Sequence, residues 1–532
     1  MAERHQVVIV GGGPVGVGLA VELGLRDIDC VVIERRRELP NLPKGQNLTS
    51  RTLEHFYFWG IEDELRDARI MPKDYPIGGV TAYGNLMSEY WFRPGRGLGR
   101  GRSHYYVDGD RMPQYRLEAV LRKKIESLSS VKILYETTVK KVEQDANGVS
   151  VTYDSGVWPY DEETIVGDYV IGCDGTRSIV REQLGIKQMG SDFEQKMVLA
   201  VFSSTAFNDA LDRFPHSSIF RALDPEFNGY PFNFGRVVVG ESFFFLAPVP
   251  NDTSKENYDF QALLNRAAGF EFEATFDHVG FWDLKVSVAD KYQVGRAFIA
   301  GDSAHSHPPF GGFGLNNGLE DITNLGWKLA AVLKGWGGDK LLDSYTEERR
   351  PVFWEVAEDF IARGMEREGE FLNTFSPEKD EAEFKREWRK FQDDGGNRTL
   401  IYEPNYEGSP VVIGPEGAVC SAHGSFEFAA RPGHHLSPQP LSGGRYLPAE
   451  LGAGFTLLAL DANDDDVQKI VRVAESEGVP LTVVRDTREG GRQRYESKLI
   501  LVRPDQHIVW VGDDAPHDPV KVMRKVTGRT WA

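Results

Sequence analysis

The stretch QVVIVGGGPVGVGLAVELGLRDIDCVVIE, residues 6–34, decides the fold. An apolar run from Gln6 to Val10 leads into glycines at 11, 13 and 16, then a helical segment, then a second apolar run that ends at Glu34. This order predicts the first parallel βαβ unit of a doubly wound sheet. Glycine permits a tight turn, close approach of the backbone to a pyrophosphate and close helix packing, while the helix N-terminus favours phosphate charge. The stretch therefore predicts dinucleotide binding, with Glu34 accepting hydrogen bonds from a ribose.

Two later segments narrow the choice of dinucleotide. They are YVIGCDGTRSIVR at 169–181 and GRAFIAGDSAHSHPPFGGFGLNNGLEDITNLGWKL at 295–329. In the second segment an apolar strand ends at Gly301 and Asp302, which places the carboxylate at the edge where open α/β sheets bind ligands. The glycine-rich stretch that follows leads into a helix expected to begin near Asn316, whose backbone N–H groups would face a partly anionic ring carbonyl. Such a site suits a flavin that must accumulate negative charge.

With these three motifs in this order, residues 5 to about 400 resemble the para-hydroxybenzoate hydroxylase family of single-component flavoprotein aromatic hydroxylases. The resemblance implies a permanently held FAD, reduced by NADPH or NADH without a second Rossmann domain, and oxygen transfer from O2 to a phenol-like ring through a flavin C4a-hydroperoxide. Lys44 departs from the arginine that many members carry, and lysine lacks the planar fork of arginine. The expected cofactor-binding residues are Gly11, Gly13, Pro14, Gly16, Glu34, Arg35, Lys44, Gln114, Asp174, Gly175, Arg181, Asp302, Pro308, Gly311, Gly314, Leu315 and Asn316.

The expected fold class is α/β, with a Rossmann-like FAD-binding domain, an inserted antiparallel-sheet substrate domain and a C-terminal α/β domain. The last, around LVRPDQHIVW and ARPGHHLSPQPL, resembles the thioredoxin-like extension of the phenol hydroxylase branch. It carries no CxxC pair, so disulfide exchange is not expected. The expected segments are 1–71, 105–185 and 290–350 for FAD, 72–104 and 186–289 for substrate, 351–400 for a helical connection and 401–532 for the extension.

The substrate side needs aromatic walls that exclude water and polar groups that orient a phenol. The expected catalytic residues are Gln46, His104, Pro308 and Phe310. The expected substrate-binding residues are Arg221, Asn233, Phe234, Arg236 and Phe245. Aromatic side chains are more often core than pocket, so a purely structural interpretation stays open for this group. A histidine is the natural base by its pKa, although the sequence does not choose one.

Composition excludes several partner classes. The formal net charge of −19 disfavours nucleic acid and anionic membrane, and no apolar run is long enough for a bilayer span or resembles a signal peptide. Three isolated cysteines, Cys30, Cys173 and Cys420, fit a reducing cytosol and no zinc site. His305 and His307 lack ligand companions, so no metal is expected and His305 is interpreted as structural. We expect a cytoplasmic homodimer whose partners are a small aromatic substrate and O2.

Two other classes remain open. A flavin reductase, halogenase or tailoring enzyme of secondary metabolism could use the same fold, although the GWxWxIP segment usual in halogenases is missing. A catalytically inactive flavin-binding scaffold is the alternative outside enzymes, and the intact glycine and aspartate motifs disfavour it. No carboxylate clamp is evident, so a large or neutral phenol, a pyridinol or a polyketide fits the sequence as well as a small benzoate.

Overall fold

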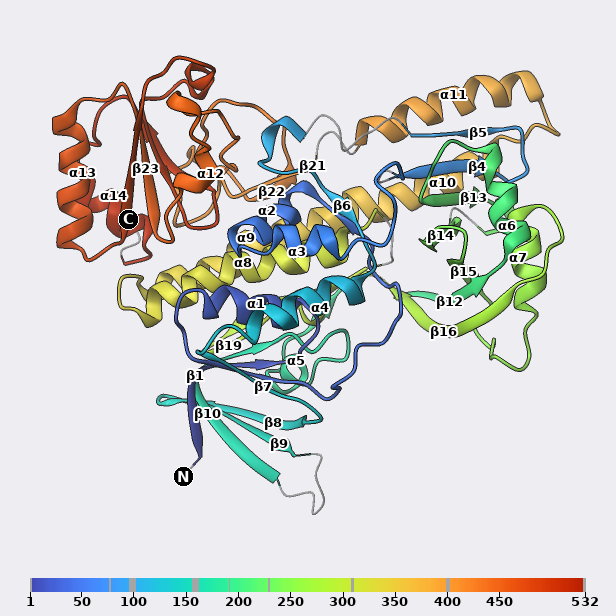
Figure 1. The fold of residues 1–532 in the computed structure, drawn as a ribbon, viewed down its shortest axis with the longest axis horizontal. Helices are drawn as coiled ribbons and strands as arrows, with labels where there is room; N and C mark the ends of the chain where they lie inside the picture. Colours follow the sequence, from blue (N-terminus) through green and yellow to red (C-terminus); the bar gives the residue numbers. More distant parts are fainter. Residues whose placement is uncertain are drawn as a thin grey trace.

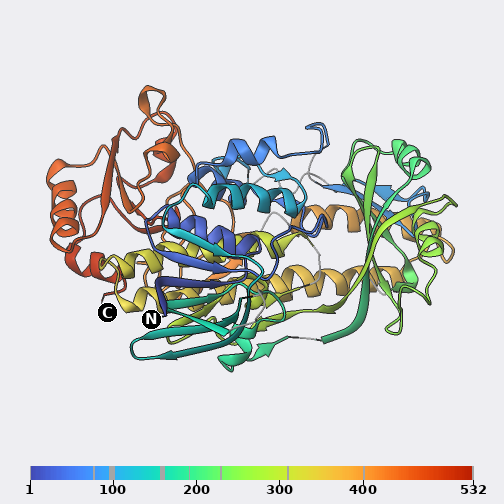
Figure 2. The ribbon, with the colours of Figure 1, turned by 60° about the horizontal axis from the view of Figure 1, so that its bottom comes forward.

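The computed structural model describes residues 2–75, 78–94, 102–155, 162–190, 192–227, 230–307, 311–398 and 402–529. Three large sheets organise the molecule (Figure 1). The first sheet lies in the middle, the second at one end beside α10 and α11, and the C-terminal sheet at the opposite end, an arrangement that both views show (Figure 2). The mixed α/β fold class predicted from the sequence is confirmed.

The first sheet has the strand order β18, β19, β10, β1, β2, β7, with β8 and β9 joined to it through β10. Its central strands are parallel, as the first βαβ unit predicts. Helix α1 packs against both α4 and α8. The bounds are β1 Glu3–Val10, β2 Cys30–Ile33, β7 Val131–Leu134, β8 Thr138–Asp145, β9 Gly148–Asp154, β10 Glu162–Gly172, β18 Gln293–Val294, β19 Ala297–Ile299, α1 Pro14–Gly24, α4 Gln114–Ile125 and α8 Phe313–Leu333.

The second sheet has the order β16, β12, β15, β14, β13, β4, β5 and is antiparallel at every pairing except β13 with β4. This parallel pair joins β4, from an earlier part of the chain, to the rest of the sheet. Phe207 and Leu264, from α6 and α7, belong to the buried core of this sheet. The bounds are β4 Gly79–Tyr83, β5 Trp91–Phe92, β12 Asp192–Ser203, β13 Ile219–Leu223, β14 Phe232–Val238, β15 Ser242–Val249, β16 Thr275–Lys285, α6 Thr205–Ala210 and α7 Phe260–Ala268.

A continuous helical run leaves α8 and reaches the second sheet. It consists of α9 Asp339–Glu355, a π-helical segment Val356–Ala362 and α10 Arg363–Thr374, after which α11 spans Glu381–Arg398. Phe371 of α10 and Trp388 of α11 pack in one cluster with Tyr83 and Leu223 of the second sheet. Helices α10 and α11 therefore pack against the second sheet.

The C-terminal extension, which we define as residues 402–529, contains a four-stranded sheet in the order β24, β23, β25, β26. Strand β23 is parallel to β24 and antiparallel to β25, and helices α13 and α14 lie together beside it (Figure 1). This sheet with its helices is α/β, the class expected for the extension. The bounds are β23 Phe455–Leu460, β24 Leu481–Asp486, β25 Leu499–Val502, β26 Ile508–Gly512, α12 Leu447–Glu450, α13 Asp464–Ser476 and α14 Pro519–Val526.

Short elements join these units. They are β3 Asn47–Leu48, β6 Asp110–Arg111, β11 Gln188–Met189, β17 Ser287–Ala289, β20 His305–Ser306, β21 Tyr402–Asn405, β22 Ser421–His423, α2 Ser50–Phe58, α3 Glu62–Asp67 and α5 Ile179–Gln183. No helix in the described ranges is long and apolar enough to cross a membrane.

Candidate active site

The predicted glycine turn connects β1 to α1 with the backbone geometry that its sequence requires. Gly11 has a φ of +102°, and a Cβ there would lie 2.4 Å from the carbonyl oxygen of Cys173. A Cβ on Gly16 would lie 1.9 Å from the carbonyl oxygen of Gly11, so this position needs glycine for close helix packing. Gly13 has no atom within 4 Å of its ideal Cβ, so it faces open space. The turn thus presents backbone at the N-terminus of α1 to a ligand phosphate.

Glu34 follows β2 directly and contributes to the same turn. One carboxylate oxygen accepts the backbone N–H of Gly12 at 2.7 Å and the other accepts that of Arg36 at 2.8 Å. A carboxylate has about four acceptor positions. Glu34 can therefore brace the turn and still accept a ribose hydroxyl, the role expected from the sequence.

The DG segment forms a braced turn behind the cleft. The carboxylate of Asp174 accepts hydrogen bonds from Ser178 Oγ at 2.5 Å, from Ser303 Oγ at 3.0 Å and from the Ile179 backbone at 2.8 Å. Arg181 is buried and donates to the carbonyls of Ser303 and Thr176, and burial lowers the pKa of its guanidinium. Arg181 thus ties the DG turn to the GD segment and does not line the cleft.

The GD segment presents Asp302 to the cleft at the end of β19. The Asp302 side chain lines the cleft and is exposed to solvent there. The backbone N–H of Gly301 donates to Asp321 at 3.0 Å, and His305 Nε2 lies 2.6 Å from the same carboxylate oxygen. His305 is 1% exposed. Its contact with Asp321 holds the GD segment in place, which agrees with the structural role expected for it.

Helix α8 begins at Phe313, three residues before the predicted start. Gly311 and Gly312 adopt φ values of +71° and +77°, so the turn into the helix is completed earlier than the helical pattern of the sequence suggests. The Asn316 side chain donates to the carbonyls of Asn47 and Gly312, at 2.9 and 2.6 Å, and accepts the Thr49 backbone N–H at 3.0 Å. Asn316 therefore fastens the 47–49 segment to the start of α8.

These segments enclose one elongated cleft of about 600 Å³. Thirteen of the predicted residues line it: Gly11, Gly13, Pro14, Glu34, Arg35, Lys44, Gln46, Gln114, Asp174, Gly175, Asp302, Gly314 and Leu315. Gly16, Arg181, Gly311 and Asn316 do not line it. Pro308 and Phe310 fall outside the described residues. The cleft suits FAD, because open backbone at Gly13 and at the N-terminus of α8 meets acidic side chains placed for hydroxyl groups.

Sequence reasoning missed several further residues of the cleft, among them Arg122 and Glu118. Arg122 donates to the carbonyl of Arg37 at 2.6 Å and stacks on Tyr135, and Glu118 lies between it and Gln114 on the same helix face. The spacing of four residues from Gln114 to Glu118 to Arg122 is the signal that would have placed all three on one face. Arg122 adds a positive charge beside Gly12, where a phosphate is expected.

The predicted substrate residues divide between the two faces of the second sheet. Phe234 and Phe245 are in contact inside the aromatic core, with ring centroids 4.6 Å apart. Arg221 and Asn233 pair across β13 and β14 on the opposite face, because successive side chains alternate. Arg221 forms an ion pair with Glu368 of α10, in which Nη2 lies 2.9 and 2.7 Å from the two carboxylate oxygens. Of these four residues, Arg221 and Asn233 are the ones on a face that the aromatic core does not occupy.

Arg236 and His104 occupy separate environments. Arg236 is buried, donates to Asn208 Oδ1 at 2.6 Å and lies over three aromatic rings of the second sheet region. His104 contacts the extension, with Nδ1 3.0 Å from Ser437 Oγ and its ring 4.0 Å from that of Phe428. Burial lowers the pKa of His104. Neither side chain lines the 600 Å³ cleft.

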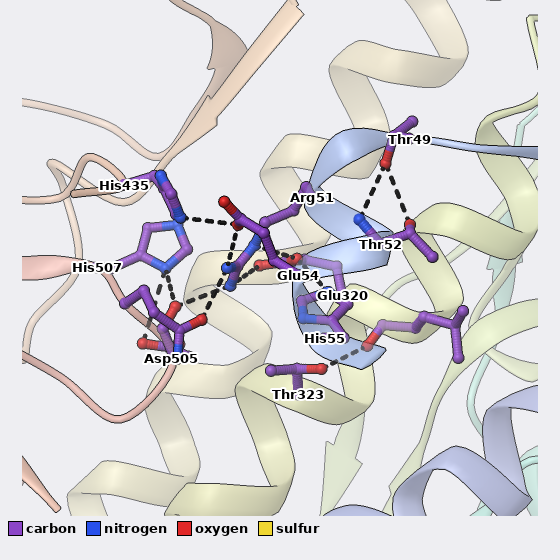
Figure 3. Close-up of polar contacts among 12 residues, drawn as sticks. Thr49, Arg51, Thr52, Glu54, His55, Glu320, Thr323, His435, Asp505 and His507 are labelled. Carbon is purple, nitrogen blue, oxygen red and sulfur yellow. Dashed lines mark hydrogen bonds and ion pairs between the residues drawn. The ribbon is translucent and has the colours of Figure 1, made fainter. Parts of the chain in front are cut away.

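The extension joins the FAD-binding domain through buried charges next to Asn316. Figure 3 shows Arg51 of α2 among Glu54, Glu320 and Asp505, with His435 directed at Glu54. Arg51 pairs with Glu320 at 3.0 Å and with Glu54 at 3.1 Å, and donates to the carbonyl of Asp505 at 2.8 Å. His435 lies 2.9 Å from Glu54. The extension therefore contacts α2 through buried charges, and Arg51 links this contact to Glu320 of α8.

The contact between the extension and α2 should weaken in acid, because His507 lies beside Asp505 in the extension. Burial lowers the pKa of His507 to about 4, despite the opposing carboxylate of Asp505. The folded chain keeps His507 neutral while the unfolded chain binds a proton near pH 6.5, so stability falls as pH drops from about 6.5 to about 4. We expect His507→Gln to flatten this part of a plot of melting temperature against pH. Identical slopes in both proteins would contradict this assignment.

Comparison with known proteins assigns the family. The model of the FAD binding domain matches residues 4–359, and that of the C-terminal domain of aromatic-ring hydroxylases matches residues 430–530. The fold and cleft define an FAD-binding oxidoreductase. The chain belongs to the FAD-dependent aromatic-ring hydroxylases, which confirms the predicted family and its phenol hydroxylase-like extension.

Two relatives and one solved structure align with most of this chain. A dialkyldecalin synthase of Streptomyces rugosporus is 34% identical over 68% of this chain and 74% of its own. A rifampicin monooxygenase of Streptomyces venezuelae is 29% identical over 96% of both chains. A structure of RebC, soaked with chromopyrrolic acid and holding 7-carboxy-K252c, has a TM-score of 0.84 and 27% identity, with 100% of both chains covered.

Proposed function

We propose that this FAD-dependent monooxygenase hydroxylates a neutral phenolic ring, with NADPH or NADH as reductant and O2 as oxidant. The observation that carries the proposal is the cleft where the ends of β1, β10 and β19 meet the N-termini of α1 and α8. Bound FAD would supply electron transfer and oxygen activation. Gly13, Arg122 and Glu34 would hold its nucleotide end, and Asp302, Gly314 and Leu315 its flavin end.

The substrate would lie against the face of the second sheet that carries Arg221 and Asn233. The end of β14 is joined to the cleft, because Arg111 donates both to the carbonyl of Arg236 and to the Gln46 side chain. Glu368 neutralises Arg221, so this arginine is not free to clamp a substrate carboxylate. A neutral phenol, pyridinol or polyketide ring suits such a surface better than a benzoate. Asn233 would orient its hydroxyl group.

The proposal is tested with purified protein, FAD and a panel of phenolic and polyketide rings. We expect a yellow protein in which one ring compound accelerates NADPH or NADH oxidation, with one O2 consumed per product and one ¹⁸O atom from ¹⁸O2 in the product. A protein that releases no flavin on denaturation would rule the proposal out.

One relative suggests a second candidate function. The dialkyldecalin synthase has a name that does not describe an oxygen insertion. A tailoring reaction on the same fold would give product without ¹⁸O and without net consumption of NADPH or NADH. The same assay therefore separates the two functions. The predicted homodimer is checked on the same preparation by size-exclusion chromatography with light scattering.

A further inference from the structure

Arg111 is a buried arginine at the seam between the FAD cleft and the second sheet. Strand β6, which carries it, pairs antiparallel with β3, and Asn47 stands opposite Arg111. Arg111 is 1% exposed and ranks among the largest fully buried side chains of the described chain. Its guanidinium is therefore removed from water.

Neutral groups supply all of its side-chain contacts. One terminal nitrogen donates to Asn47 Oδ1 at 3.0 Å, and the other donates to Gln46 Oε1 at 2.7 Å and to the carbonyl of Arg236 at 3.1 Å. Its Nε has no acceptor. Within the described ranges no carboxylate pairs with this guanidinium, since the adjacent Asp110 carboxylate is bound to Arg66 and Arg69.

An uncompensated buried charge is strongly unfavourable. Burial, reinforced by the charge of Arg69, lowers the pKa of Arg111 to about 9, which still leaves it protonated at neutral pH. The other fully buried arginines differ in this respect. Arg349 pairs with Asp321 at 2.8 Å, and Arg503 pairs with Glu348 at 2.7 Å and with Asp505. Arg111 alone among these three holds a positive charge with no anion beside it.

The two amides that Arg111 holds border the cleft. Gln46 and Asn47 both line it, and the carbonyl of Asn47 accepts the hydrogen bond from Asn316 at the start of α8. The Asn47 side chain lies 3.5 Å from the ideal Cβ position of Gly312. The positive charge therefore stands directly behind the glycine turn that would receive the flavin ring.

We propose that Arg111 is a positioning residue whose positive charge, acting through Gln46 and Asn47, stabilises bound FAD in its reduced, anionic state. The inference rests on FAD binding as proposed above. Hydride transfer from NADPH or NADH adds two electrons and one proton to the ring, which leaves one negative charge on it and releases NADP⁺ or NAD⁺. A buried cation without a counter-ion favours that charged state over the neutral oxidised one.

The midpoint potential of the bound FAD tests this role, measured by dye-coupled reduction without substrate or nicotinamide cofactor. Arg111→Met should lower the affinity for reduced FAD about tenfold relative to oxidised FAD, which is a drop of about 30 mV in potential. Arg111→Lys, which keeps the charge, should restore most of the potential. Arg69→Met serves as the matched control, because Arg69 is already balanced by Asp110. It should shift the potential much less than Arg111→Met.

A second variant keeps the test decisive if Arg111→Met does not fold. Gln46→Glu preserves size and places a carboxylate against the guanidinium, so it should lower the potential in the same direction. A wild-type potential in Arg111→Met, or in Gln46→Glu where Arg111→Met is insoluble, overturns the inference. If the wild-type protein binds no FAD at all, the proposed function itself is wrong. This outcome is distinct from an unchanged potential, which contradicts only the role of Arg111.

Discussion

Asp302→Ala is expected to lose bound FAD while keeping its fold. No group in the described ranges donates a hydrogen bond to the Asp302 side chain, although it lines the cleft at the end of β19. Its carboxylate is therefore available to a ligand hydroxyl. A hydrogen bond to a charged acceptor is worth about 1.5–3 kcal/mol, so its loss should weaken FAD binding about 10- to 100-fold. The ratio of flavin absorbance to protein absorbance after gel filtration measures the effect.

Asp174→Ala is the matched control, since its carboxylate braces protein groups. It accepts hydrogen bonds from Ser178, Ser303 and Ile179, so its removal should lower the melting temperature of the flavin-free protein. Asp302→Ala should leave that temperature close to wild type, and Asp302→Asn should recover part of the binding. Full flavin occupancy in Asp302→Ala would remove Asp302 from the cofactor site.

The parts of the site that were predictable are those set by the backbone. Positions 11 and 16 require glycine, because a Cβ at either position would collide with main-chain atoms, and this requirement is visible in the sequence. Asp302 was placed by the same logic, since a residue that follows a short apolar strand must sit at a sheet edge. These requirements are local, so they can be read without knowing the rest of the fold.

The parts that were not predictable depend on what covers a strand or loop. Alternation along β14 and β15 puts Phe234 and Phe245 on one face, but it does not say that α6 and α7 bury that face. His104 was expected near the ring, yet the extension covers it through Ser437 and Phe428. The sequence around Arg111 does not reveal that it lacks a counter-ion. That property arises only when the separate segments that carry Gln46, Arg111 and Arg236 come together. Such features need tertiary contacts, which a single sequence does not contain.

Glu348→Ala is expected to have the largest effect on stability, because Glu348 joins the extension to the helical core. Its carboxylate pairs with Lys328 at 2.8 Å and with Arg503 at 2.7 Å, and it accepts the Ser409 hydroxyl at 2.6 Å. All three charged side chains are fully buried. Removing one partner of a buried ion pair costs about 3–5 kcal/mol. Lys328 would stay buried without its carboxylate partner, while Arg503 would keep only its pair with Asp505. Urea unfolding measures this loss.

Acid unfolding provides an independent test of the role of Glu348. Burial raises the pKa of Glu348, but Arg503 and Lys328 outweigh it and lower the pKa to about 2. Stability from this carboxylate is therefore complete above about pH 4.5 and is lost as pH falls toward 2. The variant should lack this component of the acid transition. Asp343→Ala, which breaks an exposed pair with Lys340, should change stability by less than about 1 kcal/mol. Equal losses in the two variants would show that the buried network does not hold the extension in place.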